Sequence, residues 1–230
     1  MAINSRKVAM VGCGFVGSAS AFALMQSKLF SEMVLIDADQ NRAEGEALDI
    51  SHGMAFASPM KIYAGTYDDV SDAAIIVITA GANQKPEETR LDLIQKNAKI
   101  MRSIIGEIKK RDFEGILLIV SNPVDILTYV FSKISGLPEH QIMGSGTILD
   151  TARLRYDLSH RYHIAQKNIH AYVYGEHGDT SFIPWSLAQI SGCPLSEYED
   201  MMVKRNVTKN RLDPEQTLKY VQKSGGEIIA

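Results

Sequence analysis

Residues 7–17 read KVAMVGCGFVG, a short apolar run followed by three glycines in the spacing G-x-G-x-x-G. The apolar run is typical of a buried strand, and the small residues from Phe15 to about Lys28 are typical of a helix. Glycines allow the tight turn between them and a close approach of the backbone to a ligand. A turn of this kind, between a strand and a helix, places a pyrophosphate at the helix N-terminus.

The next apolar run, 33–37, ends in an acid. Asp37 lies twenty residues beyond Gly17, the spacing expected for the carboxylate that binds the adenosine ribose. A carboxylate there accepts hydrogen bonds from both ribose hydroxyls and repels a 2′-phosphate, so the pattern favours NAD over NADP. The residues predicted to bind the cofactor in this part of the chain are Gly12, Gly14, Phe15, Val16, Gly17 and Asp37.

Further strands and helices alternate up to about residue 145. Helices are predicted over 40–53 and 91–110, and strands over 61–64, 72–80 and 115–120. The strands are continuously apolar, as expected when both faces of a parallel sheet are covered. The alternation predicts an α/β fold with a doubly wound parallel (Rossmann) sheet. Residues 1–145 are therefore predicted to form an NAD-binding domain, and 146–230 a second, α+β substrate-binding domain.

Composition narrows the class of protein. The 230 residues are 45% hydrophobic and 22% charged with a net charge of -3, so neither nucleic acid nor an anionic membrane is an expected partner. The two cysteines, Cys13 and Cys193, lie far apart, so neither a disulfide framework nor a metal site is expected. No signal peptide or membrane-spanning run is evident, and a cytoplasmic location is predicted.

A second group of candidate residues lies between 150 and 179. His177 stands between glycines in Gly175–Asp179, where the backbone can approach a ligand. Asp150 and Arg153 are three residues apart on a predicted helix. They could be an ordinary intrahelical ion pair worth about a few tenths of a kcal/mol. Alternatively, Asp150 fixes the tautomer of His177 while Arg153 binds a carboxylate with two parallel hydrogen bonds. The residues alone leave both interpretations open.

Five segments together resemble one family. They are GCGFVG, AGANQKPEETRLDL, SNPVD, GTILDTAR and HAYVYGEHGD, in this order. In them the chain resembles the NAD-dependent L-lactate dehydrogenases of bacterial type, within the lactate/malate dehydrogenase family. The resemblance extends from Lys7 to about Trp185.

The resemblance implies a role for each catalytic residue. His177 would be the proton donor and acceptor, and Asp150 the carboxylate that orients it. Arg153 would bind the substrate carboxylate, and Arg90, in a mobile loop, would polarise the keto group. The implied reaction is hydride transfer from NADH to pyruvate, giving L-lactate. Two cationic donors in a closed, dry site would stabilise the negative charge that develops on the keto oxygen.

The resemblance also implies residues that bind the nicotinamide and the substrate side chain. Asn122 would contact both the nicotinamide and the substrate, while Gly81 and Ser145 would contact the cofactor. Gln84 stands where malate dehydrogenases are expected to have arginine. A neutral glutamine leaves the second carboxylate of a dicarboxylate without a partner, at a cost of about several kcal/mol. Pyruvate is therefore the favoured substrate, and malate or a bulkier 2-hydroxy acid is the alternative.

An allosteric site is implied at Arg155 and His170, which match positions where bacterial relatives bind fructose 1,6-bisphosphate across a subunit interface. Two cations can bind a phosphate. The alternative is that Arg155 is an ordinary solvated side chain and that His170 only packs against its neighbours. A homo-oligomer, either a dimer or a homotetramer, and a place in glycolysis and fermentation are implied with it.

The chain departs from the family in two places. Members are substantially longer, and the stretch VQKSGGEIIA, 221–230, resembles a helix that would normally continue. The second domain is therefore expected to be incomplete, and a catalytically impaired, NAD-binding or oligomerising truncated form is a further alternative. Glu87 replaces a glycine that relatives usually have, which would restrict the loop around it.

Overall fold

A computed structural model describes residues 2–82 and 90–229 of this chain, and the side chains of residues 90–94 and 229 are not among those described. The described chain divides into two compact units, Met1–Gly144 and Ser145–Ala230. The division falls one residue before the boundary that the sequence pattern predicts. Each unit has its own hydrophobic core.

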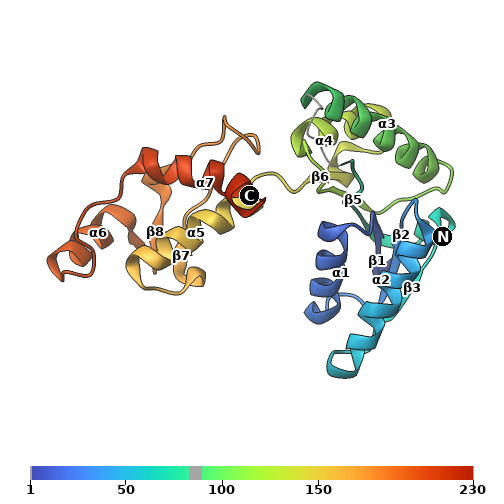
Figure 1. The fold of residues 1–230 in the computed structure, drawn as a ribbon, viewed down its shortest axis with the longest axis horizontal. Coiled ribbons are helices and arrows are strands. Elements are labelled where there is room, and N and C mark those ends of the chain that lie inside the picture. Colours follow the sequence, from blue (N-terminus) through green and yellow to red (C-terminus); the bar gives the residue numbers. More distant parts are fainter. Residues whose placement is uncertain (1, 83–89, 230) are drawn as a thin grey trace. The chain divides into compact units, whose positions relative to one another are not determined.

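The first unit is built on a sheet of six described strands in the order β3-β2-β1-β4-β5-β6, in which neighbouring strands are all parallel (Figure 1). The strands are β1 (Asn4–Val11), β2 (Glu32–Ile36), β3 (Lys61–Ala64), β4 (Ala73–Ile78), β5 (Ile116–Ile119) and β6 (Ile142–Gly144). This order places the crossover point between β1 and β4, where doubly wound sheets bind their ligands. The predicted fold class is confirmed.

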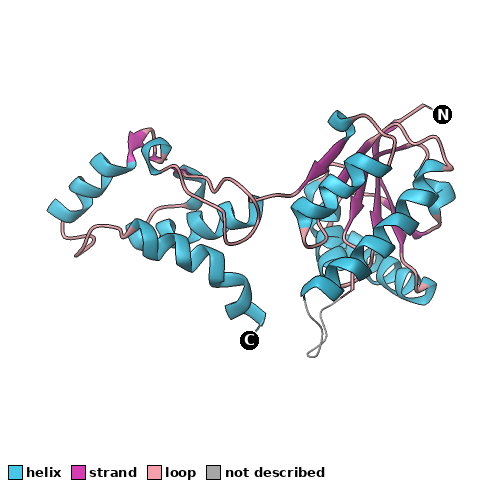
Figure 2. Ribbon diagram, turned by 90° about the horizontal axis from the view of Figure 1, so that it is seen from above, coloured by secondary structure: helices cyan, strands magenta, loops and turns pink. Residues whose placement is uncertain are grey.

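Helices cover both faces of this sheet (Figure 2). They are α1 (Phe15–Ser27), α2 (Gln40–His52), α3 (Arg90–Lys109) and α4 (Val124–Ile134). Along β1, Val8 and Met10 belong to the core under α1 and α2, whereas Ala9 and Val11 belong to the core under α3 and α4. Because successive side chains point to opposite faces of a strand, burial on both faces requires the continuous apolar runs seen in the sequence.

One strand and one α-helix of the first unit were not predicted from the sequence. The strand β6 has three residues, too few for an apolar pattern to be recognised, and its place in the sheet comes from pairing with β5. The helix α4 begins directly after Pro123, within a segment interpreted only as a binding motif. Proline is well tolerated at the start of a helix, where its missing N–H has no partner to lose.

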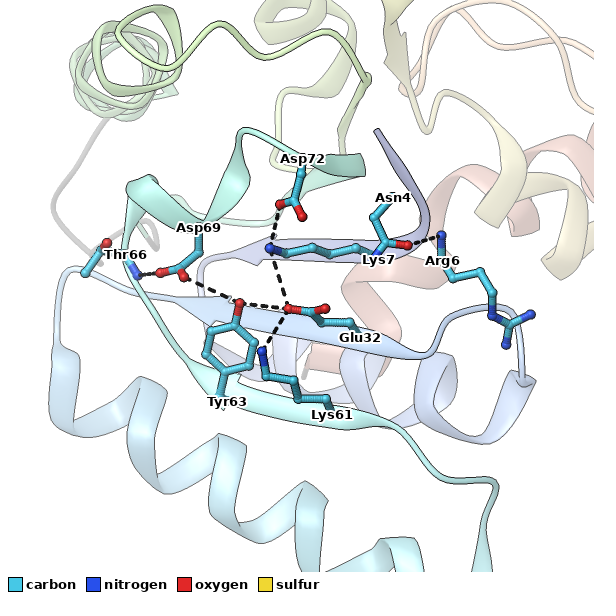
Figure 3. A network of polar contacts seen from close by, with 9 residues as sticks. All are labelled: Asn4, Arg6, Lys7, Glu32, Lys61, Tyr63, Thr66, Asp69 and Asp72. Atoms are coloured by element: carbon cyan, nitrogen blue, oxygen red, sulfur yellow. Dashed lines mark hydrogen bonds and ion pairs between the residues drawn. The ribbon is translucent and has the colours of Figure 1, made fainter. Parts of the chain in front are cut away.

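A polar network joins the amino-terminal ends of the strands (Figure 3). The ammonium of Lys7, on a side chain that is 6% exposed, lies 2.6 Å from Asp72 Oδ1 and 3.6 Å from Glu32 Oε1. Glu32 also accepts hydrogen bonds from Lys61 Nζ and from the Tyr63 hydroxyl. The network thus connects β1, β2, β3 and the residue before β4. It lies at the amino-terminal end of the parallel strands, whereas the glycine-rich turn lies at their carboxyl-terminal end.

The second unit combines helices with a small antiparallel sheet, in agreement with the predicted α+β class. Its elements are α5 (Ile148–Tyr162), β7 (Ile169–His170), β8 (Gln189–Ile190), β9 (Cys193–Pro194), α6 (Leu195–Lys204) and α7 (Pro214–Ile229). Leu154, Leu158 and Tyr162 of α5 form the centre of its core, with Val221 of α7.

The segment 171–174 follows β7 directly. It contributes one isolated bridge, between Tyr174 and Phe182. None of the described helices is both long enough and apolar enough to cross a membrane.

Short 3-10 helices complete the described structure. They are Gly53–Phe56, Tyr67–Val70, Glu139–Gln141, Gln166–Asn168 and Trp185–Leu187. They connect the longer elements without adding a layer to either unit.

Candidate functional site

The glycine-rich turn follows β1 directly, and close backbone contacts require two of its glycines. Gly12 has φ +102°, and a Cβ added to it would lie 2.4 Å from Ala80 N. A Cβ on Gly17 would lie 1.9 Å from Gly12 O, so α1 could not approach the turn with any larger residue there. A Cβ on Gly14 meets nothing within 4 Å among the described atoms, so this side of the turn is open to a ligand.

The N-terminus of α1 fits an anion. Gly14 precedes the helix, and the described part of the chain provides no side-chain cap for it and no acidic residue in the first turn. Phe15 and Val16 are 95% and 56% exposed. The N–H groups of a helix's first turn carry partial positive charge, which favours a phosphate group.

Asp37 is held at the mouth of the same turn by two backbone donors. Its Oδ2 accepts a hydrogen bond of 2.6 Å from the N–H of Cys13, and its Oδ1 accepts one of 2.9 Å from the N–H of Asp39. A carboxylate oxygen has more than one acceptor position, so Asp37 can also accept from a ribose hydroxyl. Burial, and then the Asp37 charge, raises the pKa of the Cys13 thiol to about 12, so Cys13 stays neutral.

The turn opens onto a cavity of about 890 Å³ within the first unit. Six predicted cofactor residues line it: Gly12, Gly14, Phe15, Val16, Asp37 and Gly81. Its polar lining also includes residues that were not predicted, namely Arg42, Glu46, Tyr67, Thr79 and Ser103. The donors, the open glycine and this volume fit a dinucleotide.

One sequence signal could have indicated part of this lining. Arg42 lies in the first turn of α2, the helix that begins three residues after Asp37. A cation so close in sequence to the ribose carboxylate is a candidate for the same site. Tyr67, Thr79 and Ser103 come from separate segments, and the sequence holds no pattern that joins them.

A buried amide connects the other predicted residues of the first unit. Asn97 of α3 is 2% exposed. Its Oδ1 accepts a hydrogen bond of 2.8 Å from the N–H of Ala82, and its Nδ2 donates one of 2.9 Å to the carbonyl of Asn122. Asn97 therefore fixes Ala82, next to Gly81, relative to Asn122, a connection that the sequence did not reveal.

The catalytic candidates of the second unit come together. His177 Nδ1 lies 2.6 Å from Asp150 Oδ2, and Asp150 is 4% exposed. Arg153 Nη1 lies 3.5 Å from Asp150 Oδ1, so the intrahelical ion pair is present but long. The Arg153 side chain is 16% exposed, and its Nε is buried without a hydrogen-bond partner among the described residues.

The loop that carries His177 is closed at its base. Tyr174 and Phe182 exchange backbone hydrogen bonds of 2.8 and 2.9 Å, and Gly175 has φ +92°, a conformation that favours glycine. Upstream, the Thr147 hydroxyl donates to the carbonyl of Val173, whose N–H donates to the hydroxyl of Thr151. The N-terminal part of helix α5 therefore holds the segment that enters the loop.

Three further predicted residues, Arg155, His170 and Ser145, lie in the second unit. Arg155 Nε donates to the carbonyl of Ala171, directly after the exposed His170. The Arg155 guanidinium lies 4.7 Å from the centre of the Tyr172 ring. Ser145 is half-buried at the start of the second unit, where its carbonyl accepts from the N–H of Ile148.

Part of the predicted loop lies outside the described structure. Arg90 begins α3, but its side chain is outside the described residues, as are Gln84 and Glu87 entirely.

Known families and proteins match most of the length of the chain. The family profile described as lactate/malate dehydrogenase, NAD binding domain, matches residues 6–144, and that described as lactate/malate dehydrogenase, alpha/beta C-terminal domain, matches 147–230. The L-lactate dehydrogenase of Priestia megaterium is 56% identical over 195 residues, which are 85% of this chain and 61% of that protein. That of Acetivibrio thermocellus is 50% identical over 209 residues, 90% of this chain and 66% of that protein.

Solved structures agree with these matches. A lactate dehydrogenase enzyme from a Medee basin deep-sea metagenome library has a TM-score of 0.90 at 44% identity, covering 99% of this chain and 71% of that one. A minor L-lactate dehydrogenase from Enterococcus mundtii in a ligands-bound form has a TM-score of 0.90 at 41% identity, covering 98% and 71%. The chain spans less than two thirds of the length of the two relatives above.

Proposed function

Because this chain belongs to the lactate/malate dehydrogenase family, with that family's NAD-binding domain as its first unit, we propose that it acts in hydride transfer between NAD and a 2-hydroxy acid. The proposed pair is L-lactate and pyruvate. The observation that supports it most is the group formed by Asp150, His177 and Arg153. In this group the Asp150 carboxylate contacts the His177 imidazole through one oxygen and the largely buried Arg153 guanidinium through the other.

His177 carries the proton in this proposal. Its Nδ1 donates to Asp150, so the other ring nitrogen, Nε2, exchanges a proton with the substrate oxygen. The Asp150 carboxylate stabilises the imidazolium, which gives its Nε2 proton to the keto oxygen as pyruvate is reduced. In the reverse direction the neutral imidazole accepts the hydroxyl proton of lactate. NADH, when bound, supplies the hydride.

Arg153 binds the substrate carboxylate. A buried Nε that lacks a partner among the described residues leaves hydrogen-bonding capacity to be filled, and a carboxylate fits the planar guanidinium with two parallel bonds. The 3.5 Å separation from Asp150 is too long to satisfy the arginine by itself. The same charge would fix the orientation of a 2-oxo acid before proton transfer.

Two measurements on the purified chain test this proposal. NADH binding is followed by fluorescence titration, and turnover by the pyruvate-dependent loss of NADH absorbance. We expect binding together with turnover. Binding without turnover would contradict the dehydrogenase proposal for this chain and support an NAD-binding or oligomerising role instead.

Gln84 is proposed to select a substrate with a small uncharged side chain. We expect Gln84→Arg to raise the ratio of oxaloacetate to pyruvate turnover by about tenfold or more, since an added cation neutralises the second carboxylate. Turnover of branched 2-oxo acids separates a bulkier substrate from both. An unchanged ratio would remove Gln84 as the discriminating residue.

Activation by fructose 1,6-bisphosphate and assembly into a dimer or tetramer are proposed on the resemblance alone. Arg155 would bind a phosphate together with His170. The test measures pyruvate turnover and sedimentation with and without fructose 1,6-bisphosphate, in the wild type and in Arg155→Gln. Activation equal in both proteins would exclude Arg155 from such a site.

A further inference from the structure

Helix α7 contacts the loop that carries His177 through one side chain. Gln222 Nε2 lies 3.1 Å from the carbonyl of Asp179, and 3.3 Å from both the carbonyl and the hydroxyl of Ser181. All three atoms can accept a hydrogen bond, and Gln222 presents its amide nitrogen, the donor end, to them. Ser181 is 5% exposed, so the contact is on the inner side of the loop.

The same face of α7 lies against the second catalytic candidate. Gly225, three residues beyond Gln222 and hence one turn further along the helix, lies opposite Arg153. A Cβ added to Gly225 would lie 3.4 Å from Arg153 Nη2. Val221, next to Gln222, is fully buried in the core and packs α7 in place. One rigid helix thus contacts both the loop of His177 and the guanidinium of Arg153.

The loop also has hydrogen bonds of its own. Tyr174 and Phe182 close its base, but Gly178 and Asp179 near its tip are exposed. Within the loop, the N–H of Ser181 donates to the carbonyl of Gly178 at 3.3 Å, and the Thr180 hydroxyl donates to Glu176 Oε2 at 3.0 Å. Short exposed segments with glycine open locally at low cost. Gln222 therefore adds hydrogen bonds to the loop from the side of α7, at Asp179 and Ser181.

We propose that Gln222 is a positioning residue for His177. Its amide holds residues 179–181 so that the imidazole Nδ1 stays hydrogen-bonded to Asp150. This inference rests on the proposed function for its effect on turnover, and on the geometry of the second unit alone for its effect on the loop.

Two substitutions separate the donor from mere packing. Gln222→Glu keeps the size of the side chain but replaces the donor with a carboxylate that faces three acceptors. Gln222→Met keeps the length and removes the polar end. The matched control is Gln216→Met, at an exposed glutamine on the same helix. Far-ultraviolet circular dichroism verifies that all variants fold.

The first measurement does not require activity. Amide hydrogen exchange at residues 178–181 should become at least about tenfold faster in Gln222→Glu and Gln222→Met, and stay within about twofold of wild type in Gln216→Met. The ring nitrogens of His177, followed by ¹⁵N NMR, should lose the signature of Nδ1 bonded to a carboxylate. Unchanged exchange and unchanged ring signals in both Gln222 variants would overturn the inference.

The second measurement connects the loop to the reaction. The kcat for pyruvate should fall about tenfold or more in both Gln222 variants, while the dissociation constant of NADH remains within about twofold. If the wild type binds NADH without turnover, the proposed function fails, and the exchange and NMR results still decide the role of Gln222. If NADH binding in the Gln222 variants is weakened as much as kcat is lowered, the inference about Gln222 is also overturned, because such a result would indicate general unfolding.

Discussion

The charged side chain of Arg153 is only 16% exposed, and its Nη1 lies 3.5 Å from Asp150 Oδ1. Asp150 is shared, since His177 lies on its other oxygen at 2.6 Å. One buried carboxylate therefore contacts both neighbours. A single substitution in this group should change binding or proton transfer separately, according to which neighbour is removed.

Replacing Arg153 tests the role in carboxylate binding. We expect Arg153→Gln to lower kcat/KM for pyruvate by about 100- to 1000-fold, or about 3–4 kcal/mol, because a charge-assisted pair in a buried setting is lost. NADH affinity should remain near wild type. Steady-state kinetics and NADH titration measure the two quantities.

Arg155→Gln is the control, two residues along the same helix, where the Nε donates to a backbone carbonyl. Its kcat/KM in the absence of effectors should stay close to that of wild type. Comparable losses in both variants would indicate a general disturbance of α5 and would remove Arg153 from carboxylate binding.

At the scale of elements, Asn97 connects three segments of the first unit. We expect Asn97→Leu to lower the free energy of unfolding by about 2–4 kcal/mol, since the Ala82 N–H and the Asn122 carbonyl both lose their partner. It should also weaken NADH binding, because Gly81 lines the cavity next to Ala82. Urea unfolding and NADH titration provide the measurement.

Asn97→Asp is the informative comparison for that prediction. It keeps an acceptor for the Ala82 N–H but loses the donor to Asn122, so its stability should lie between those of wild type and Asn97→Leu. A Leu variant as stable as wild type would show that the buried amide is not a structural link.

The network at the amino-terminal ends of the strands makes stability depend on pH. Burial opposes ionisation of Glu32, but hydrogen bonds from Lys61 and Tyr63 and the charge of Lys7 outweigh it, so the pKa of Glu32 is lowered from 4.5. A carboxyl group with a lowered pKa stabilises the fold above its unfolded pKa, and this contribution is lost as the pH falls through the folded value.

Glu32→Gln tests this dependence. The variant should be less stable at pH 7 and should lose stability less steeply than wild type as the pH falls from about 5 to 3. Urea unfolding at a series of pH values provides the curve. Parallel curves for the two proteins would show that Glu32 makes no net contribution to acid sensitivity.

At the scale of the whole molecule, each unit buries its own core, and Trp185, the single tryptophan, packs against the core of the second. Tryptophan fluorescence therefore reports unfolding of the second unit, whereas NADH binding reports the first. Leu154 of the second core and Leu117 of the first are 0% and 1% exposed, which makes them a matched pair.

Truncating each leucine should affect one unit at a time. Leu154→Ala should cost about 2–5 kcal/mol in the fluorescence-detected transition and leave NADH affinity within about twofold of wild type. Leu117→Ala should weaken NADH binding instead and leave the tryptophan transition in place. Equal shifts of the transition in both variants would indicate that the chain unfolds as one cooperative unit.

The sequence by itself determined the fold class and the chemistry of the first unit's turn. Continuous apolar runs identify strands buried on both faces, and the glycines at 12 and 17 are needed because neighbouring backbone leaves no room for a Cβ. Whereas the backbone that Gly12 meets, at Ala80, comes from a distant segment, the spacing of these glycines is local in the sequence. The spacing of Asp150 and Arg153 on one helix was accessible for the same reason.

The tertiary structure decided the contacts between segments that no periodic pattern relates. Asn97 meets Ala82 and Asn122, 15 and 25 residues away, and Gln222 meets Asp179, 43 residues away. Hydrogen bonds of this kind depend on the packing of whole elements, so an amide side chain in a sequence gives no indication of its partner. The three-residue β6 belongs to the sheet for the same reason, because its neighbour β5 supplies the pairing.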